Sequence, residues 1–285
     1  MKTLKDYFQK AKAEKWAIGQ FNFSVFEQLK GILSASLELN SPLILGTSEK
    51  ESDYFGLEEI TALCKAIKKK YKAEVFLNLD HAKNPDLITK AIKLGYDGVH
   101  YDGSLLSYEE NIKNTKGVVE AARKKNVFVE GELGVIKGES TLHKKEEATI
   151  KDIELTLPSK AQDFIEKTGV DSLAISVGTI HGIYEKEPQI DFERLEKINK
   201  ASKSFLVLHG GSGISEQDLK KAISLGINKI NFNTELRFVW RDSLLKVLER
   251  AEEYKPYNIL PEVQDKIKQK VEEKINILGS KNKKI

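Results

Sequence analysis

The strongest constraint on the fold is a pattern that repeats along the chain, in which a short β-branched or apolar run is followed by an amphipathic stretch. These runs predict eight strands. Consecutive strand ends lie about 30 residues apart, which is the length of one strand–helix unit. The predicted strands are Trp16–Phe23, Pro42–Thr47, Glu74–Asp80, Gly98–Tyr101, Val127–Glu132, Ser172–Val177, Phe205–His209 and Lys229–Phe232.

The segments between these runs have the residue spacing of amphipathic helices. Several end near a Gly or Asn, residues that readily adopt the left-handed conformation at a helix C-terminus. These residues are Asn40, Gly95, Asn126, Gly169 and Gly226. The predicted helices are Phe26–Leu39, Leu57–Tyr71, Asp86–Leu94, Tyr108–Lys125, Lys160–Thr168, Phe192–Ala201 and Glu216–Leu225.

Eight units within about 230 residues favour an α/β fold of the closed (β/α)8 type, the TIM barrel, over an open doubly wound sheet. We expect one barrel domain that spans residues 1–285. Two extra C-terminal helices, Glu235–Tyr254 and Pro261–Leu278, are predicted after the last strand. The sequence leaves open whether the apolar residues of the second pack on the barrel or on another subunit. These residues are Val263, Ile267, Val271, Ile275 and Leu278.

Charge and composition exclude several classes of protein. The 46 basic and 43 acidic residues nearly balance, which argues against a nucleic-acid partner. No run approaches the roughly 18 apolar residues of a membrane span, and Met1–Lys15 lacks the apolar core of a signal peptide. We therefore expect a cytoplasmic protein without a membrane partner. A single cysteine, Cys64, excludes a disulfide framework and a cysteine zinc cluster.

Three of the five histidines follow predicted strands, at the end of a barrel where catalytic groups lie. His81, His181 and His209 follow the third, sixth and seventh strands. Three imidazoles with an open fourth position describe a catalytic zinc site, so we expect zinc or a similar divalent ion there. The alternative is three separate structural roles. His100 and His143 are expected not to be ligands.

Carboxylates stand at the same strand ends. Asp102 and Glu132 are expected to offer a second, weaker metal position or hydrogen-bond partners for the imidazoles, with ordinary polar lining as the alternative. Asp80 precedes His81 directly, which suits it to general acid–base catalysis. Lys229 is a candidate for Schiff-base chemistry, but pairing with Glu130 or Glu132 is favoured.

Glycines follow the seventh predicted strand, in the segment His209-Gly210-Gly211-Ser212-Gly213. Glycines let backbone N–H groups approach an anion, and the helix that begins nearby adds its dipole. The segment Asn231–Thr234 follows the eighth strand and enters another helix. In a (β/α)8 barrel these two loops usually hold a phosphate group.

Motifs stand at the strand ends in a fixed order. They are Asn22, Ser48-Glu49, Leu79-Asp80-His81, Tyr101-Asp102-Gly103-Ser104, Glu130-Gly131-Glu132-Leu133-Gly134, Gly178-Thr179-Ile180-His181-Gly182, Leu208-His209-Gly210-Gly211-Ser212-Gly213 and Lys229-Ile230-Asn231-Phe232-Asn233-Thr234. In this combination, over nearly the whole chain, they resemble the class II (zinc-dependent) fructose-bisphosphate and tagatose-bisphosphate aldolases.

The resemblance implies reversible aldol cleavage of a ketose bisphosphate, with fructose 1,6-bisphosphate first, to dihydroxyacetone phosphate and an aldehyde such as glyceraldehyde 3-phosphate. A tagatose-bisphosphate aldolase, another ketose-phosphate aldolase, or a sugar-phosphate- and metal-binding barrel without full catalysis are the alternatives. The family also implies a homodimer or homotetramer.

The resemblance further implies a role for each site residue. Zinc would be held by His81, His181 and His209, with Asp102 and Glu132 at a second metal position, and Asp80 would move the proton of the C4 oxygen. Asn22 and Ser48 would contact substrate. Dihydroxyacetone phosphate would be bound, with help from a sodium or potassium ion, by Gly182, Gly210, Gly211, Ser212, Asn231, Phe232, Asn233 and Thr234.

The chain departs from the family in its loops. The usual Gly-Gly-x-Glu-Asp loop is replaced by Ile136–Thr141, which keeps only Glu139 as an acid, and Ser104–Ser107 replaces Ser-His-Leu-Pro. Tyr257 stands where the family has an arginine that binds the second phosphate. We therefore expect the enzyme to discriminate less strictly between substrates that differ in the aldehyde half. The sequence leaves open whether a nearby cation compensates: Lys255, Arg237, Arg241 or Arg250.

Overall fold

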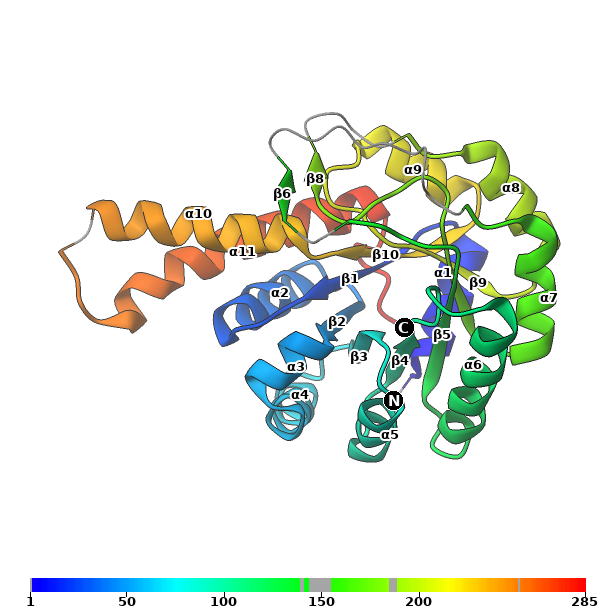
Figure 1. Cartoon of the computed structure of the whole chain (residues 1–285). Helices are drawn as coiled ribbons and strands as arrows, with labels where there is room; N and C mark the ends of the chain where they lie inside the picture. The colour runs from blue at the N-terminus through cyan, green and yellow to red at the C-terminus, as the bar shows by residue number, and fades with distance from the viewer. Residues whose placement is uncertain (1, 139–140, 144–154, 185–188, 251) are drawn as a thin grey trace.

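Eight parallel strands close into a barrel in the computed structural model, which describes residues 2–138, 141–143, 155–184, 189–250 and 252–285 (Figure 1). Around the barrel the order is β1-β10-β9-β7-β5-β4-β3-β2, so consecutive barrel strands are neighbours. The predicted (β/α)8 barrel is confirmed. The strands are β1 (Ile18–Asn22), β2 (Leu43–Ser48), β3 (Val75–Ala82), β4 (Gly98–Tyr101), β5 (Phe128–Leu133), β7 (Ser172–Ile175), β9 (Phe205–Leu208) and β10 (Ile227–Phe232).

Helices cover the outside of the barrel, and those predicted between strands agree with the structure to within two residues. Gly95 and Gly169 end their helices with φ of 96° and 70°, so the predicted left-handed C-terminal residues are confirmed there. The helices are α2 (Phe26–Glu38), α4 (Leu57–Tyr71), α5 (Pro85–Leu94), α6 (Tyr108–Arg123), α7 (Pro158–Thr168), α8 (Phe192–Ala201) and α9 (Glu216–Ser224).

The sequence analysis missed a helix near the N-terminus, α1 (Leu4–Glu14). Thr3 and Asp6 form a capping box at its start, which satisfies two otherwise unpaired N–H groups. Its buried face packs against aromatic side chains of the strands, and Phe8 stacks on Phe128 with ring centroids 4.6 Å apart. The helix therefore covers the end of the barrel where strands begin, opposite the strand ends with the motifs.

Three further short elements were also missed. Helix α3 (Glu49–Phe55) begins directly after β2, with Ser48 and Glu51 forming its capping box. The two-residue strands β6 (Leu142–His143) and β8 (Ile183–Tyr184) pair in parallel outside the barrel. This pair joins the segment that follows β5 to the segment that follows β7.

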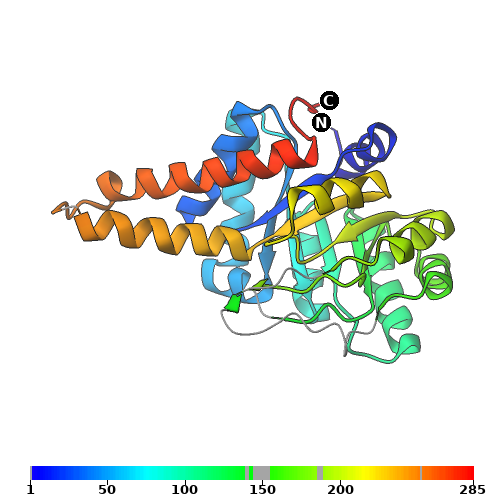
Figure 2. The same ribbon diagram turned by 90° about the horizontal axis from the view of Figure 1, so that it is seen from above.

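The last two helices, α10 (Thr234–Arg250) and α11 (Pro256–Leu278), form a hairpin that projects from the barrel (Figures 1 and 2). The C-terminal part of α11 returns to the barrel and packs on α2. Gly31 permits this approach, since a Cβ there would lie 2.8 Å from the Gln264 carbonyl oxygen. The sequence left open what the five apolar residues of α11 pack against. All five are buried within the chain itself, so they pack on the rest of this chain and not on another subunit.

Helix α11 begins five residues earlier than predicted, at Pro256 instead of Pro261. Proline fits the first turn of a helix, because the N–H groups there have no intrahelical partner. Among the described residues, no helix combines the length and the apolar character needed to cross a membrane.

Candidate active site

A cavity of about 630 Å³ opens at the end of the barrel where the strands finish. Most residues singled out by the motifs lie on its wall. It is lined by Asn22, Ser48, Glu49, Lys50, Asp80, His81, Lys83, Asp102, Ile136, Gly138, Thr141, His181, Gly182, His209, Gly210, Ser212, Asn231, Asn233, Thr234 and Arg237. Gly211, Phe232 and Glu132, which were also predicted to be site residues, are not among these lining residues.

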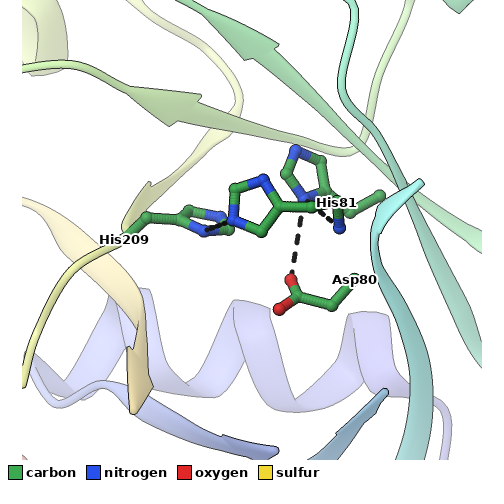
Figure 3. Close-up of side chains that lie close together, drawn as sticks. Asp80, His81 and His209 are labelled. Atoms are coloured by element: carbon green, nitrogen blue, oxygen red, sulfur yellow. Dashed lines mark hydrogen bonds and ion pairs between the residues drawn. The ribbon is translucent and has the colours of Figure 1, made fainter. Parts of the chain in front are cut away.

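The imidazoles of three histidines meet at the bottom of this cavity. His81 Nε2 lies 2.8 Å from His209 Nδ1, and the two side chains point at each other in Figure 3. The ring of His181 lies 4.8 Å from the ring of His81 and 6.0 Å from that of His209, between centroids. The structure therefore brings together the three residues predicted to be zinc ligands, although they come from three separate strand ends.

Carboxylates stand behind two of the three imidazoles. His81 Nδ1 lies 3.4 Å from Asp102 Oδ2 and 3.5 Å from Glu132 Oε2. His209 Nε2 lies 2.8 Å from Glu130 Oε1. A carboxylate on the outer nitrogen fixes the tautomer and leaves the inner nitrogen with a lone pair, as in metal-binding histidines.

Burial is the main cause that lowers the pKa of both His181 and His209, with the neighbouring histidines acting in the same direction. For His81, burial also acts to lower the pKa, but Asp80 and Asp102 outweigh it and the pKa is raised. Neutral imidazole is the form that binds a metal ion.

Some buried polar atoms of the cluster also lack a hydrogen-bond partner. Among the described residues, His100 Nε2, Glu132 Oε2 and Asn231 Oδ1 have no well-aligned hydrogen bond. Since buried polar groups are nearly always paired, the cluster suits a bound cation.

Potential ligand atoms fall into two sets, each with all atoms within 4.8 Å of one another. The second set is His81, Asp102 and Glu132. Its two carboxylates are those predicted for a second metal position. The first set contains His100, a residue that sequence reasoning set aside. It consists of Asp80, His81, His100 and His209, whereas His181, a predicted zinc ligand, is in neither set.

Asp80 lies beside the histidines and is buried. Its Oδ2 accepts a hydrogen bond from Asn22 Nδ2 at 3.0 Å, and its Oδ1 accepts one from Asn231 Nδ2 at 3.2 Å. Burial acts to raise the pKa of Asp80, but its electrostatic interactions with His81, His100, His209 and Lys229 outweigh burial and hold the pKa well below its usual range. The carboxylate is thus ionised and held by two amides, ready to accept a proton.

The glycine loop after β9 lies on the other side of the cavity. Gly210 has φ of 66°, and a Cβ there would lie 2.4 Å from the Ile180 carbonyl oxygen, so only glycine fits. The Gly211 N–H donates to the Asn231 carbonyl at 3.1 Å, which ties this loop to the end of β10. Helix α10 begins at Thr234, and its first-turn N–H groups direct positive charge toward the cavity.

Phe232 lies in the core and not on the cavity wall. Its side chain is 1% exposed and stacks on Phe21 with ring centroids 5.6 Å apart. Lys229 is also buried, and its Nζ lies 2.6 Å from Glu130 Oε2. The favoured pairing of Lys229 with a barrel carboxylate is confirmed, and Lys229 is not among the residues that line the cavity.

Sequence reasoning did not single out Glu51, which connects several parts of the site. Its carboxylate accepts hydrogen bonds from Asn22 Nδ2 at 3.1 Å and from the Ser48 N–H at 2.8 Å, and it pairs with Arg237 at 2.7 Å. The capping-box spacing Ser48-x-x-Glu51 is a sequence signal that could have identified it.

A (β/α)8 barrel with clustered imidazoles and carboxylates, a buried aspartate and a glycine loop beside a helix N-terminus has the features of a metal-dependent enzyme that acts on a phosphorylated substrate. The family model "Fructose-bisphosphate aldolase class-II" matches residues 2–283. The chain belongs to the class II fructose-bisphosphate aldolase family and is an aldehyde-lyase.

Individual relatives agree with this assignment. The chain is 38% identical over 282 residues to a sulfofructosephosphate aldolase from Alkalicoccus urumqiensis, covering 98% of this chain and 96% of that protein. It is 35% identical over 285 residues to a fructose-bisphosphate aldolase from Staphylococcus aureus, covering 99% and 98%. The crystal structure of the YdjI aldolase from Escherichia coli K12 matches with a TM-score of 0.85 at 30% identity, covering 100% and 99%.

Proposed function

We propose that the chain catalyses zinc-dependent, reversible aldol cleavage of a ketose bisphosphate, with fructose 1,6-bisphosphate as the first substrate to test. The products are dihydroxyacetone phosphate and glyceraldehyde 3-phosphate. The observation that carries the proposal is the position of Asp80, an ionised carboxylate beside three converging imidazoles in one cavity. A general base next to a metal-type site suits C–C cleavage at a hydroxyl group.

In this proposal the zinc ion is held by His81, His181 and His209. When bound, it supplies Lewis-acid stabilisation of the negative charge that develops at the C2 carbonyl oxygen. Asp80 accepts the C4 hydroxyl proton as the C3–C4 bond breaks, and returns it in the condensation direction. Asn22 and Asn231 hold the Asp80 carboxylate in place during this transfer.

The remaining parts of the proposal concern binding. The loop Gly210–Ser212, Gly182 and the segment Asn231–Thr234 hold the phosphate of dihydroxyacetone phosphate, together with a sodium or potassium ion. A second divalent ion lies near Asp102 and Glu132, the enzyme acts in the cytoplasm, and it is a homodimer or homotetramer.

Proton exchange tests this function most directly. The enzyme should exchange a C3 proton of dihydroxyacetone phosphate in heavy water, measured by NMR, because that step needs the metal and a base but no second substrate. EDTA should abolish the exchange and the cleavage of fructose 1,6-bisphosphate, and zinc or cobalt should restore both. Full activity after verified removal of metal would refute the zinc dependence.

The main alternative is a barrel that binds sugar phosphates and metal without full catalysis. It is favoured by the loop Ile136–Thr141, which has fewer acids than the family's usual loop; Glu139, its one acid, lies outside the described residues. Binding of dihydroxyacetone phosphate without any proton exchange would favour this alternative.

The identity of the aldehyde half depends on which cations face the cavity. Tyr257, which replaces the family's arginine, is 71% exposed on the projecting hairpin. Arg237 lines the cavity but is paired with Glu51 at 2.7 Å, and Lys83 Nζ lies 3.7 Å from Asp102 Oδ2. Lys50 also lines the cavity and, among the described residues, makes no ion pair. We propose that Lys50 binds an anionic group at the far end of the sugar.

Lys50→Met should therefore lower kcat/KM for fructose 1,6-bisphosphate by about 10- to 100-fold, the value of one charge-assisted contact. It should leave kcat/KM for fructose 1-phosphate within about twofold, because that substrate has no second anion. Lys90→Met, which removes an exposed lysine outside the cavity, is the control. Equal losses on both substrates would contradict a role at the far end.

The kind of anion is settled by the same assay. Relatives of this chain include both a fructose-bisphosphate aldolase and a sulfofructosephosphate aldolase. Comparing 6-deoxy-6-sulfofructose 1-phosphate with fructose 1,6-bisphosphate distinguishes a sulfonate from a phosphate at this end. We expect weak discrimination at the aldehyde half because Tyr257 replaces the arginine. This expectation would be contradicted if kcat/KM for the bisphosphate exceeded that for fructose 1-phosphate by more than roughly 10³-fold, which is more than one contact explains.

A further inference from the structure

The bulge in β3 solves a geometric problem of this site. Asp80 and His81 are adjacent in sequence, and adjacent residues of a regular strand point to opposite faces of the sheet. Both nevertheless line the cavity. Leu79 pairs with Val99 and Ala82 pairs with Tyr101, so two residues of β3 lie opposite a single residue of β4, which is His100. This is the arrangement of a β-bulge.

The bulge imposes strain on His81. Its φ is 48°, in the left-handed region that few residues other than glycine adopt. Such a conformation is strained and persists only where the surroundings hold it in place. The side chain of His100 supplies such a contact, since His100 Nδ1 accepts a hydrogen bond from the His81 N–H at 3.1 Å.

The His100 side chain is completely buried and close to the other parts of the site. Its Nδ1 lies 3.7 Å from Asp80 Oδ1, and its Nε2 lies 3.2 Å from Glu132 Oε2. Only the contact with the His81 N–H is a well-formed hydrogen bond of this ring. Because Nδ1 accepts that N–H, it carries no proton in this arrangement, and the N–H of the ring is at Nε2.

We propose that His100 is a positioning residue: its Nδ1 holds the strained backbone of His81, so that the Asp80 carboxylate and the His81 imidazole enter the cavity from adjacent positions. The inference rests on the proposed metal site, but it concerns the backbone and is separable from it. Losing this hydrogen bond would let His81 relax toward regular strand geometry and turn its ring away from His209.

Two amide variants distinguish the role of His100 Nδ1 from that of His100 Nε2, and a third variant removes both nitrogens. In His100→Asn, the amide oxygen takes the position of Nδ1 and can still accept the His81 N–H. In His100→Gln, the longer amide reaches the position of Nε2 but leaves that N–H without its acceptor. His100→Leu removes both polar atoms. Tyr96→Phe is the control, because it removes a buried hydroxyl contact with Thr47, at 3.3 Å, that has no link to the bulge.

Zinc affinity, measured by competition with a chelator, is the first readout. His100→Leu and His100→Gln should weaken zinc binding by about 10- to 100-fold, the usual effect of losing a group that orients a ligand. His100→Asn and Tyr96→Phe should stay within about threefold of the unmodified protein. Rescue by Gln and not Asn, equal losses for all three His100 variants, or no loss in His100→Leu would each overturn the proposal.

Hydrogen exchange of the metal-free protein gives a readout that does not depend on zinc. The peptide containing residues 79–83 should exchange faster in His100→Leu than in His100→Asn, with the other barrel strands unchanged. A general loss of protection across the barrel would show that His100 only stabilises the fold and would overturn the proposal. If the unmodified protein binds no zinc but this local difference is observed, the proposed function fails and the positioning role stands.

Discussion

Asp80→Ala should lower turnover of fructose 1,6-bisphosphate by roughly 10²–10⁴ while zinc stays bound, the effect expected for loss of a general acid–base group. The reason is its position: two amides hold the carboxylate beside the imidazoles, and its low pKa keeps it ionised, so its oxygen atoms carry no proton of their own. Steady-state kinetics and metal analysis of the same preparation measure the two effects separately.

Asp86→Ala, an exposed aspartate at the start of α5, is the matched control and should keep both properties. Asp80 also belongs to a set of atoms close enough to share a metal ion. If Asp80→Ala loses zinc and activity in the same proportion, the carboxylate is a ligand and not the proton acceptor.

His209→Ala should lose zinc and activity together. Its Nδ1 faces His81 while Glu130 holds its Nε2, so the variant leaves a proposed three-nitrogen site with two ligands. After dialysis against a chelator, we expect metal content to fall from about one zinc per chain, the stoichiometry of a single catalytic site, to near zero. Atomic absorption on the folded variant, checked by circular dichroism, measures it.

Ser172→Ala is the control for His209→Ala, because the Ser172 hydroxyl lies 3.5 Å from the same Glu130 carboxylate but does not line the cavity. It should keep its zinc. Zinc content that is unchanged in His209→Ala would refute the three-histidine site.

The fold could be predicted from the sequence because each barrel strand is a short apolar run followed by a helix with a clear end. Helix α1 was missed although its signals are present in the sequence, since Leu4, Tyr7, Phe8 and Ala11 have the spacing of an amphipathic helix. Helix α3 was missed for a different reason. It has only seven residues, and its start depends on Ser48 and Glu51 acting together.

The site residues also differ in how well the sequence alone could identify them. His81, His181 and His209 could be identified because all three stand at the end of a strand or in the loop after it: His81 near the end of β3, His209 directly after β9 and His181 in the loop after β7. Phe232 could have been set aside by alternation, since Lys229 and Asn231 share one face of β10 and Phe232 lies on the other, in the core.

His100 could not be placed from its own strand. Its contact with the His81 backbone exists only because β3 contains a bulge, and nothing in the pattern of apolar residues near Leu79 and Ala82 reveals an extra residue there.

The last unit of the barrel has a consequence for how the chain folds. Strand β1 pairs with β10, so that Ile18 lies beside Lys229, and the Ala17 N–H donates to the Leu278 carbonyl at 3.1 Å. These contacts join residues more than 200 positions apart, and the second of them involves the last residue of α11. Contacts between distant residues slow folding. During synthesis, the strands made first cannot close the barrel until β10 has left the ribosome, and until then β1 presents an open edge.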